Sequence, residues 1–134
     1  MGEIFTMAAD GAGWTQLTSL GLTTAFPSWS ADGSRLAVAS YISSNYEIQV
    51  LDANGANARN VSNHPSEDIF PSWSPDGTKI AFQTNRDGRT EIYVMNADGS
   101  GLRNLTNRPS LRGSLLCRRD ACSSGSGARA QVLP

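Results

Sequence analysis

The sequence has little of what catalytic and metal-binding domains need. Its 134 residues include a single histidine, His64, and only two cysteines, Cys117 and Cys122, which lie close together near the end. Such a pair makes neither a disulfide framework nor a zinc site. No Gly-x-Ser-x-Gly nucleophile elbow occurs. We therefore expect no catalytic site, no metal, no cofactor, and no hydrolase or lyase activity.

Charge and long apolar runs are also scarce. The net charge is −1, and no basic block precedes the last two dozen residues, which argues against nucleic acid as a partner. No apolar run reaches the roughly 18 residues of a membrane span. The opening residues have neither a cationic start nor an apolar stretch, so we do not expect a secretory signal.

What the sequence does contain is a repeat of 44 residues. Residues 26–66 and 70–110 align without a gap and share 18 identities in 41 positions. The same offset places residues 3–19 on the second half of the unit. The chain therefore holds a half copy followed by two whole copies.

The repeat is lost after residue 110. The next copy should open at Ser114 with Phe-Pro-Ser-Trp, but the sequence there is Ser-Leu-Leu-Cys. Residues 1–110 carry 7 basic and 11 acidic groups, whereas residues 111–134 carry 4 arginines and 1 aspartate. We interpret 111–134 as an aberrant or disordered tail outside the fold, which a shifted reading frame or a genuine low-complexity segment would explain.

Each copy contains four short strand signals separated by turn signals, the pattern of an all-β fold. In the last copy we expect strands at 70–74, 79–84, 91–95 and 102–106. The apolar run of the second strand predicts burial on both faces. Four antiparallel strands at a period of about 40–50 residues describe a β-propeller blade. The predicted units are an outer half-blade with its connection (3–25), two blades (26–69 and 70–110) and the tail (111–134), which together make an incomplete ring.

The motifs resemble a known repeat. Pro-x-Trp-Ser-x-Asp-Gly occurs at 27–33 and 71–77, Ile-Ala-Phe at 80–82, Glu-Ile-Tyr-Val-Met-x-Ala-Asp-Gly at 91–99 and Leu-Thr at 105–106. This pattern, over residues 3–110, is similar to the WD-like repeat of TolB-type β-propellers. The same blade type recurs in the propellers of tricorn-type, prolyl-oligopeptidase-type and dipeptidyl-peptidase-type proteins.

The resemblance implies a non-enzymatic scaffold that binds proteins. TolB works in the cell envelope with a peptidoglycan-associated lipoprotein, so the resemblance implies a protein partner and a periplasmic or other extracytoplasmic parent. The alternative is a fragment of the non-catalytic propeller of a prolyl-oligopeptidase or dipeptidyl-peptidase-type serine peptidase, which a neighbouring α/β-hydrolase domain would indicate. A sugar-polymer lyase propeller would need metal-binding histidines that this chain lacks.

Several residues that invite a functional reading have a structural explanation. Trp29 and Trp73 recur at the repeat offset, so we expect them to pack blades rather than bind a ligand. Hairpin turns explain the Asp-Gly and Asn-Gly pairs without calcium. The glycosylation sequons at 60–62 and 104–106 occupy one repeat position, which indicates a structural origin.

The candidate binding site is one side of the propeller. The turns at 41–45 and 85–89 and the connections at 63–69 and 107–110 emerge there and differ between the copies, whereas the opposite turns nearly repeat. The candidate partner-binding residues are Tyr41, Asn45, His64, Glu67, Asp68, Arg86, Asp87 and Arg89. We expect the charges of the 85–89 turn to be solvated, so that Arg86→Ala costs little.

An incomplete ring also predicts open blade edges. The flanks should expose apolar surface meant for neighbouring blades, around Phe5, Ile80 and Ile92. Exposed strand edges and apolar patches drive association, so self-association is expected.

Overall fold

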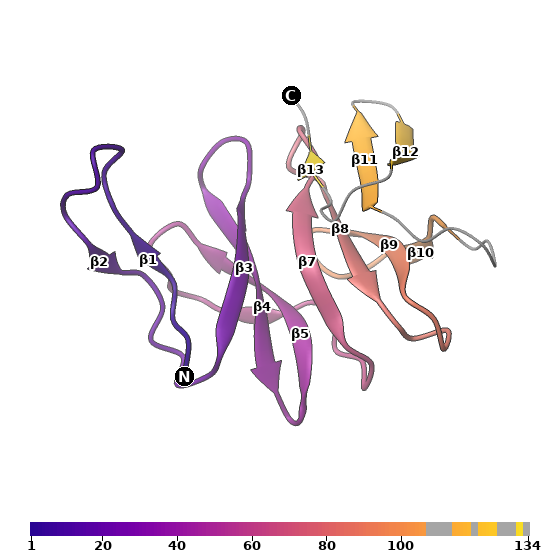
Figure 1. The fold of residues 1–134 in the computed structure, drawn as a ribbon, viewed down its shortest axis with the longest axis horizontal. Coiled ribbons are helices and arrows are strands. Elements are labelled where there is room, and N and C mark those ends of the chain that lie inside the picture. The colour runs from indigo at the N-terminus through magenta and orange to yellow at the C-terminus, as the bar shows by residue number, and fades with distance from the viewer. Residues whose placement is uncertain (107–113, 119–120, 126–130, 133–134) are drawn as a thin grey trace.

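The computed structural model describes residues 1–106, 114–118, 121–125 and 131–132 of the chain. These residues form strands and turns, and the sheets stand side by side along the long axis of the molecule (Figure 1). The strands, in chain order, are β1 (Phe5–Thr6), β2 (Thr15–Gln16), β3 (Thr24–Trp29), β4 (Arg35–Ile42), β5 (Asn45–Asp52), β6 (Arg59–Asn60), β7 (Asp68–Trp73), β8 (Lys79–Thr84), β9 (Glu91–Asn96), β10 (Arg103–Asn104), β11 (Ser114–Arg118), β12 (Ala121–Gly125) and β13 (Gln131–Val132).

Two four-stranded antiparallel sheets are the propeller blades that the repeat predicts. Blade 1 has the strand order β3-β4-β5-β6 and blade 2 the order β7-β8-β9-β10. Strands β1 and β2 form a two-stranded antiparallel sheet at the repeat positions of β5 and β6. The all-β prediction of four-stranded blades is thus confirmed.

The first strand of each blade differs from the prediction. It begins two residues before the expected phenylalanine, and its pairing is irregular between Ala25 and Ser28 in blade 1 and between Ile69 and Ser72 in blade 2. The phenylalanine inside each irregularity has a left-handed backbone, with a φ of 55° at Phe26 and 54° at Phe70. This is the signature of a bulge, which bends the strand and redirects its side chains.

The main core lies between the two blades. Strands β4 and β8 are buried on both faces, as their apolar runs predict. The buried residues of this core come from both blades: Ala37, Ala39, Ile48, Val50 and Val61 from blade 1, and Trp73, Ile80, Phe82, Tyr93 and Met95 from blade 2. The expectation of an exposed flank at Ile80 and Ile92 is therefore wrong. Ile80 is fully buried against blade 1, and Ile92 is 5% exposed.

The repeated tryptophan shows what a neighbouring blade contributes. Trp73 is 2% exposed, and the guanidinium of Arg35 from blade 1 lies 4.5 Å from the centre of its ring. Arg35 also donates a hydrogen bond to the carbonyl of Gly77 at 2.8 Å. Trp29 stands at the same position in blade 1 and is 43% exposed. The packing role is confirmed for Trp73 and wrong for Trp29, because no described strand presents an arginine to it.

Each repeat closes its outer edge with the same side-chain clip. A glutamate at the start of the third strand accepts a hydrogen bond from a hydroxyl just after the fourth strand. The same hydroxyl accepts the N–H of the isoleucine that follows the glutamate. The three clips are Glu3–Thr18–Ile4, Glu47–Ser62–Ile48 and Glu91–Thr106–Ile92. The clip holds the outermost strand, whose regular pairing extends over only two residues.

Beyond residue 106 the structure describes one small sheet of order β12-β11-β13, in which β12 pairs antiparallel and β13 parallel to β11. The expectation that residues 111–134 lie outside the blade fold stays a prediction. The connection expected at 107–110 lies outside the described residues. The described part of the chain includes no helix that could cross a membrane.

Candidate partner-binding face

The connecting segments on the predicted side are tied to one another by hydrogen bonds. Asn45, at the β4–β5 hairpin, donates from its side-chain amide to the carbonyls of His64 (2.7 Å) and Ser66 (2.9 Å) in the connection between the blades. That connection reaches the β8–β9 turn, because the N–H of Glu67 donates to Oδ1 of Asn85 at 3.1 Å. Three separate stretches of sequence therefore form one continuous surface, which we call the turn face.

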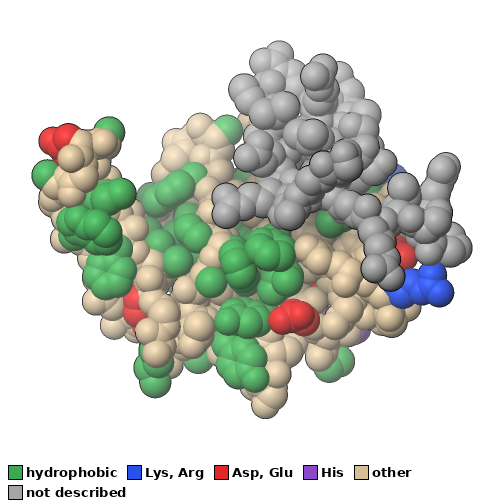
Figure 2. Space-filling view, viewed as in Figure 1, with side chains coloured by type: hydrophobic (Ala, Val, Ile, Leu, Met, Phe, Trp, Pro, Cys, Tyr) green, Lys and Arg blue, Asp and Glu red, His purple; other side chains and the backbone are tan. Residues whose placement is uncertain are grey.

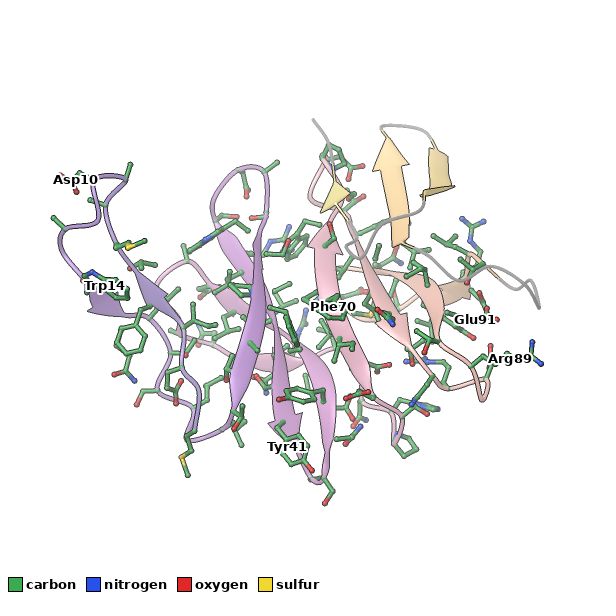
Figure 3. All side chains as sticks on the ribbon, in the orientation of Figure 1. Asp10, Trp14, Tyr41, Phe70, Arg89 and Glu91 are labelled. Carbon is green, nitrogen blue, oxygen red and sulfur yellow. The ribbon has the colours of Figure 1, made fainter. Side chains whose placement is uncertain are left out.

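The β4–β5 hairpin is tighter than the sequence indicates. The sequence predicts a turn over residues 41–45, but Tyr41 pairs with Tyr46 and Ile42 with Asn45 in the β ladder. Only Ser43 and Ser44 form the loop, and both have positive φ values of 50° and 82°. Positive φ at both central residues is the geometry of a type I′ hairpin. The expected loop is thus a rigid hairpin tip with Tyr41 on its flank (Figure 3).

Hydrogen bonds of its backbone N–H and of its ring fix His64 in place. Its N–H donates to both carboxylate oxygens of Glu47, at 3.2 and 3.1 Å, and its Nδ1 accepts the N–H of Ser66 at 3.2 Å. The Glu47 carboxylate therefore serves both the clip of blade 1 and the connection to blade 2. This arrangement makes His64 a fixed, half-buried part of the turn face.

Asp68 and Arg86 form a buried ion pair and do not belong to the exposed surface. Nη2 of Arg86 lies 3.1 and 3.0 Å from the two carboxylate oxygens of Asp68, whose side chain is fully buried. The Arg86 side chain is 8% exposed, and its guanidinium lies over the rings of Phe82 and Tyr93 at 5.4 and 4.9 Å. The expectation of a solvated Arg86 is wrong. Its immediate sequence neighbours, Asn85 and Asp87, are polar, but Asp68 on the adjacent strand supplies a buried partner for its charge.

Asp87 is also fixed, although it is exposed. The hydroxyl of Tyr93 donates to Oδ2 of Asp87, and the side-chain amide of Asn104 donates to the same oxygen at 3.0 Å. These hydrogen bonds, helped by the positive charge of Arg86, lower the pKa of the Asp87 carboxyl. Burial, together with the bond to Asp87, raises the pKa of Tyr93. The carboxylate of Asp87 is therefore presented to solvent in one orientation.

The eight candidate residues thus divide into two groups. Asn45, His64, Asp68 and Arg86 are buried or half-buried and build the turn face, whereas Tyr41, Glu67, Asp87 and Arg89 are exposed on it. Figure 3 places Tyr41 at the tip of the β4–β5 hairpin and Arg89 at the β8–β9 turn, so the exposed residues span both blades.

A cluster of aromatic side chains lies beside these residues and was not predicted. The rings of Phe26 and Phe70 are 4.3 Å apart, Tyr46 lies 6.5 Å from Phe26, and Tyr41 lies 5.3 Å from Tyr46. Phe26 is 40% and Tyr41 46% exposed. Figure 2 shows the hydrophobic side chains between β3 and β7 and over the ends of β4 and β5, with an acidic side chain next to them. The repeated Phe-Pro pair is the sequence feature that could have indicated this aromatic cluster. The bulge that turns the two phenylalanine rings toward each other cannot be predicted from the sequence.

The repeated aspartates form hydrogen bonds within the turns that contain them. Asp32 and Asp76 each accept a hydrogen bond at 2.6 Å from the serine two residues earlier, Ser30 or Ser74. Each also accepts the N–H of the residue two positions later at 3.0 Å. These bonds lower the pKa of both carboxyls to about 2. Among the described residues, no three His, Cys, Asp or Glu side chains group to hold a metal ion.

The sequons have a structural origin, as the sequence indicates. Oδ1 of Asn60 accepts the N–H of Ser62 at 3.2 Å, and Oδ1 of Asn104 accepts the N–H of Thr106 at 3.0 Å. The hydroxyls of Ser62 and Thr106 are those of the clips. The Asn-x-Ser/Thr spacing is therefore what the outer edge of the blade requires.

Comparison with known proteins agrees with the blade architecture. The model of the TolB beta propeller domain matches residues 3–120. The chain belongs to this family. No curated protein sequence matches it.

Three solved structures illustrate the range of similar folds. TolB from Acinetobacter baumannii is 23% identical, with a TM-score of 0.71 over 88% of this chain and 30% of that one. A chain of the nidogen/laminin complex is 14% identical, with a TM-score of 0.69 over 85% of this chain and 44% of that one. The β-propeller domain of the Trilobed protease from Pyrococcus furiosus is 22% identical, with a TM-score of 0.53 over 74% of this chain and 32% of that one. The TolB-like chain thus spans less than half the length of each of these chains.

Proposed function

We propose that the chain is a non-enzymatic, TolB-like scaffold that binds a protein partner through its turn face. The observation that supports this most directly is that the turn face carries both exposed aromatic rings, Phe26 and Tyr41, and exposed charged groups, those of Glu67, Asp87 and Arg89. Aromatic and arginine side chains that are rigidly held are typical of the residues that dominate protein–protein binding.

The rigidity of the face favours binding. The Asn45 bonds and the Asp68–Arg86 pair hold the hairpin, the connection and the β8–β9 turn in one arrangement. A surface ordered before binding loses less conformational entropy when a partner docks. The partner we propose, from the resemblance to TolB, is an envelope lipoprotein of the peptidoglycan-associated kind, which implies an extracytoplasmic location.

The test is a titration of the full chain with the soluble domain of a peptidoglycan-associated lipoprotein, followed by calorimetry. We expect Tyr41→Ala to weaken binding at least about tenfold, since truncation of a central aromatic residue costs about 2 kcal/mol or more. Trp14→Ala is the matched control, because Trp14 is 70% exposed and lies on the β1–β2 hairpin, outside the turn face (Figure 3). Equal binding by both variants would contradict the turn face as the site.

The absence of catalysis is a second part of the proposal. His64, the only histidine, uses Nδ1 to accept the N–H of Ser66. Purified chain should therefore not hydrolyse peptide or oligosaccharide substrates. Turnover that disappears in His64→Ala would overturn this part alone.

A second candidate is the non-catalytic propeller of a serine peptidase, which the likeness to the Trilobed protease propeller supports. Sequencing the coding DNA on both sides separates the two candidates. An α/β-hydrolase domain in the same reading frame favours the peptidase, and further blades without such a domain favour the scaffold.

A further inference from the structure

Two rings on the turn face are not required by the blade. The aromatic cluster consists of Phe26, Tyr41, Tyr46 and Phe70. At the repeat position of Tyr41, blade 2 has Asn85. At that of Tyr46 it has Thr90. Because blade 2 forms the same four-stranded sheet without these tyrosines, the two rings are free to serve binding rather than folding.

The aromatic cluster forms a continuous surface with an exposed ring at each end. Tyr46 lies between the other two rings of blade 1, 6.5 Å from Phe26 and 5.3 Å from Tyr41. Phe26 and Tyr41 are the exposed rings, and the rigid β4–β5 hairpin holds Tyr41 in place. Exposed aromatic rings that are held in this way bind apolar side chains or cations.

The charges of the turn face favour a cation. Its segments are 41–47, 63–70 and 85–91, which together carry five carboxylates and two arginines. The opposite turns of the two blades are 30–35, 52–59, 74–79 and 96–103, which carry four acidic and four basic groups. The side that bears the aromatic cluster is therefore acidic, whereas the opposite side is balanced.

The exposed charges of the turn face follow the same trend. Glu67 and Asp87 are exposed carboxylates, and Arg89 is the exposed arginine of these segments. The side chains of Tyr93 and Asn104 hold the carboxylate of Asp87 in one orientation. Figure 2 shows an acidic side chain beside the hydrophobic ones between β3 and β7. A cationic segment would thus meet both aromatic rings and carboxylates.

The chain itself shows that rings and a carboxylate together hold an arginine. The guanidinium of Arg86 lies 5.4 Å from the ring centre of Phe82 and 4.9 Å from that of Tyr93. The same guanidinium is paired with the carboxylate of Asp68 at 3.0 Å. An arginine from a partner would find the same two kinds of group on the turn face, in an exposed form.

The opposite turns are used for packing between units. A Cβ on Gly55 would lie 1.8 Å from the carbonyl oxygen of Leu17, and a Cβ on Gly99 would lie 2.4 Å from the carbonyl oxygen of Val61. In both cases the backbone of the preceding unit is packed directly onto the glycine. These contacts explain why the opposite turns nearly repeat, and they leave the turn face as the side on which the sequence varies for binding.

We propose that the turn face recognises a basic segment of its protein partner, with an arginine or lysine side chain on the aromatic cluster and other cationic groups toward Glu67 and Asp87. The inference rests on the proposed function, because it specifies the part of the partner that the same face binds. Complementary charge speeds association and selects the partner, and the rings add a contact that depends on the cation.

The first test titrates the full chain with a fluorescent peptide of alternating glycine and arginine, followed by anisotropy. The arginine peptide should bind, and more weakly as salt is added, whereas a glycine–glutamate peptide should not bind. Glu67→Gln should weaken binding about two- to threefold, the effect of one exposed charge pair. Asp98→Asn is the matched control, because it removes the same charge from an opposite turn where blade 1 has Asn54.

The second test removes a ring. Tyr41→Leu should weaken binding of the arginine peptide about three- to fivefold, through the loss of an exposed cation–π contact. Trp14→Leu is the matched control, because Trp14 is an exposed ring outside the turn face and blade 2 has Leu102 at its repeat position. Failure of the arginine peptide to bind, or equal effects within either pair of variants, would overturn the proposal.

These outcomes are distinct from those of the lipoprotein titration. Lipoprotein binding that depends on Tyr41, without binding of the arginine peptide, would overturn the basic segment and keep the protein-binding face. Binding of the arginine peptide without binding of the lipoprotein would support the basic segment and exclude that partner. A dimer that Tyr41→Leu separates, seen by light scattering without peptide binding, would assign the aromatic cluster to a second copy and overturn the proposal.

Discussion

The two complete blades have the same order of four antiparallel strands, but they fill one buried polar position differently. In blade 1 the buried hydroxyl of Thr24 lies 3.3 Å from that of Ser40, which lies 3.2 Å from Gln49. In blade 2 the residue equivalent to Thr24 is Asp68, which pairs with Arg86. The repeat therefore requires a satisfied polar group at this position, while neutral and ionic groups both meet the requirement.

The two blades also differ in what lies before them. Trp73 packs under Arg35 of the preceding blade, and Trp29 has no such neighbour in the described structure. The same residue at the same repeat position is thus a core residue in one blade and a surface residue in the other. Burial in a propeller belongs to the interface between blades as much as to the blade.

The largest expected difference is between the two tryptophans. Trp73→Ala should lower the free energy of unfolding by about 3–5 kcal/mol, because it leaves a cavity in the core between the blades. Trp29→Ala should lower it by less than about 1 kcal/mol. Urea denaturation of both variants measures this, and equal losses would mean that Trp29 is buried as Trp73 is.

Breaking the Asp68–Arg86 ion pair should have the next largest effect on the free energy of unfolding. Asp68→Ala should lower the free energy of unfolding by about 3–5 kcal/mol, because it leaves the buried charge of Arg86 without its partner. Replacing the pair with the residues of blade 1, as Asp68→Thr with Arg86→Ile, should recover most of this loss, since a buried pair is often replaceable by neutral groups. Urea denaturation again measures both, and a double variant no more stable than Asp68→Ala would show that the ionic version is required in blade 2.

Removing the hydroxyl of one clip should lower the free energy of unfolding moderately. Ser62→Ala removes the hydroxyl that joins Glu47 to the N–H of Ile48, and it should cost about 1–3 kcal/mol. Ser19→Ala, at an exposed position, is the control. Amide exchange of Ile48 should accelerate in the first variant only. Unchanged exchange would contradict the role of the clip.

The smallest effect concerns the turn aspartates. The pKa of Asp76 is lowered to about 2, so its contribution to stability is present above its ordinary value of 3.8 and is lost as the pH falls through 2. Ser74→Ala should raise the pKa of Asp76 toward 3.8, while the pKa of Asp32 stays at about 2. Carboxyl titration by NMR measures both pKa values. An unchanged pKa of Asp76 would assign the lowering to the hydrogen bonds from the backbone N–H and the hydroxyl of Thr78.

The sequence predicts the repeat and its strands well, because the signals are local and occur twice. Strand β8 covers the predicted residues, and the Asp-Gly turns have the expected hydrogen bonds. The TolB-type resemblance, drawn from Trp73 and its flanking motif, is confirmed by the match of the family model.

The contacts that the sequence does not predict join residues far apart in the chain. Arg86 looks like a solvated turn residue until Asp68, 18 residues earlier, is placed beside it. The positive φ of Phe70 depends on its register with β8, which no local pattern specifies. Exposure of Trp29 follows from a neighbour that is absent from the described structure, and a periodic sequence gives no signal for that.

The glycine contacts set the angle at which one blade follows another. Gly55 and Gly99 let a carbonyl of the preceding unit approach the turn so closely that no side chain could be accommodated. Because the same contact recurs at the same repeat position, it fixes a constant wedge angle between neighbours. A constant angle returns to its starting point only after a whole number of blades, so these two glycines, with no side chain of their own, help to determine the diameter of any complete ring built from this repeat.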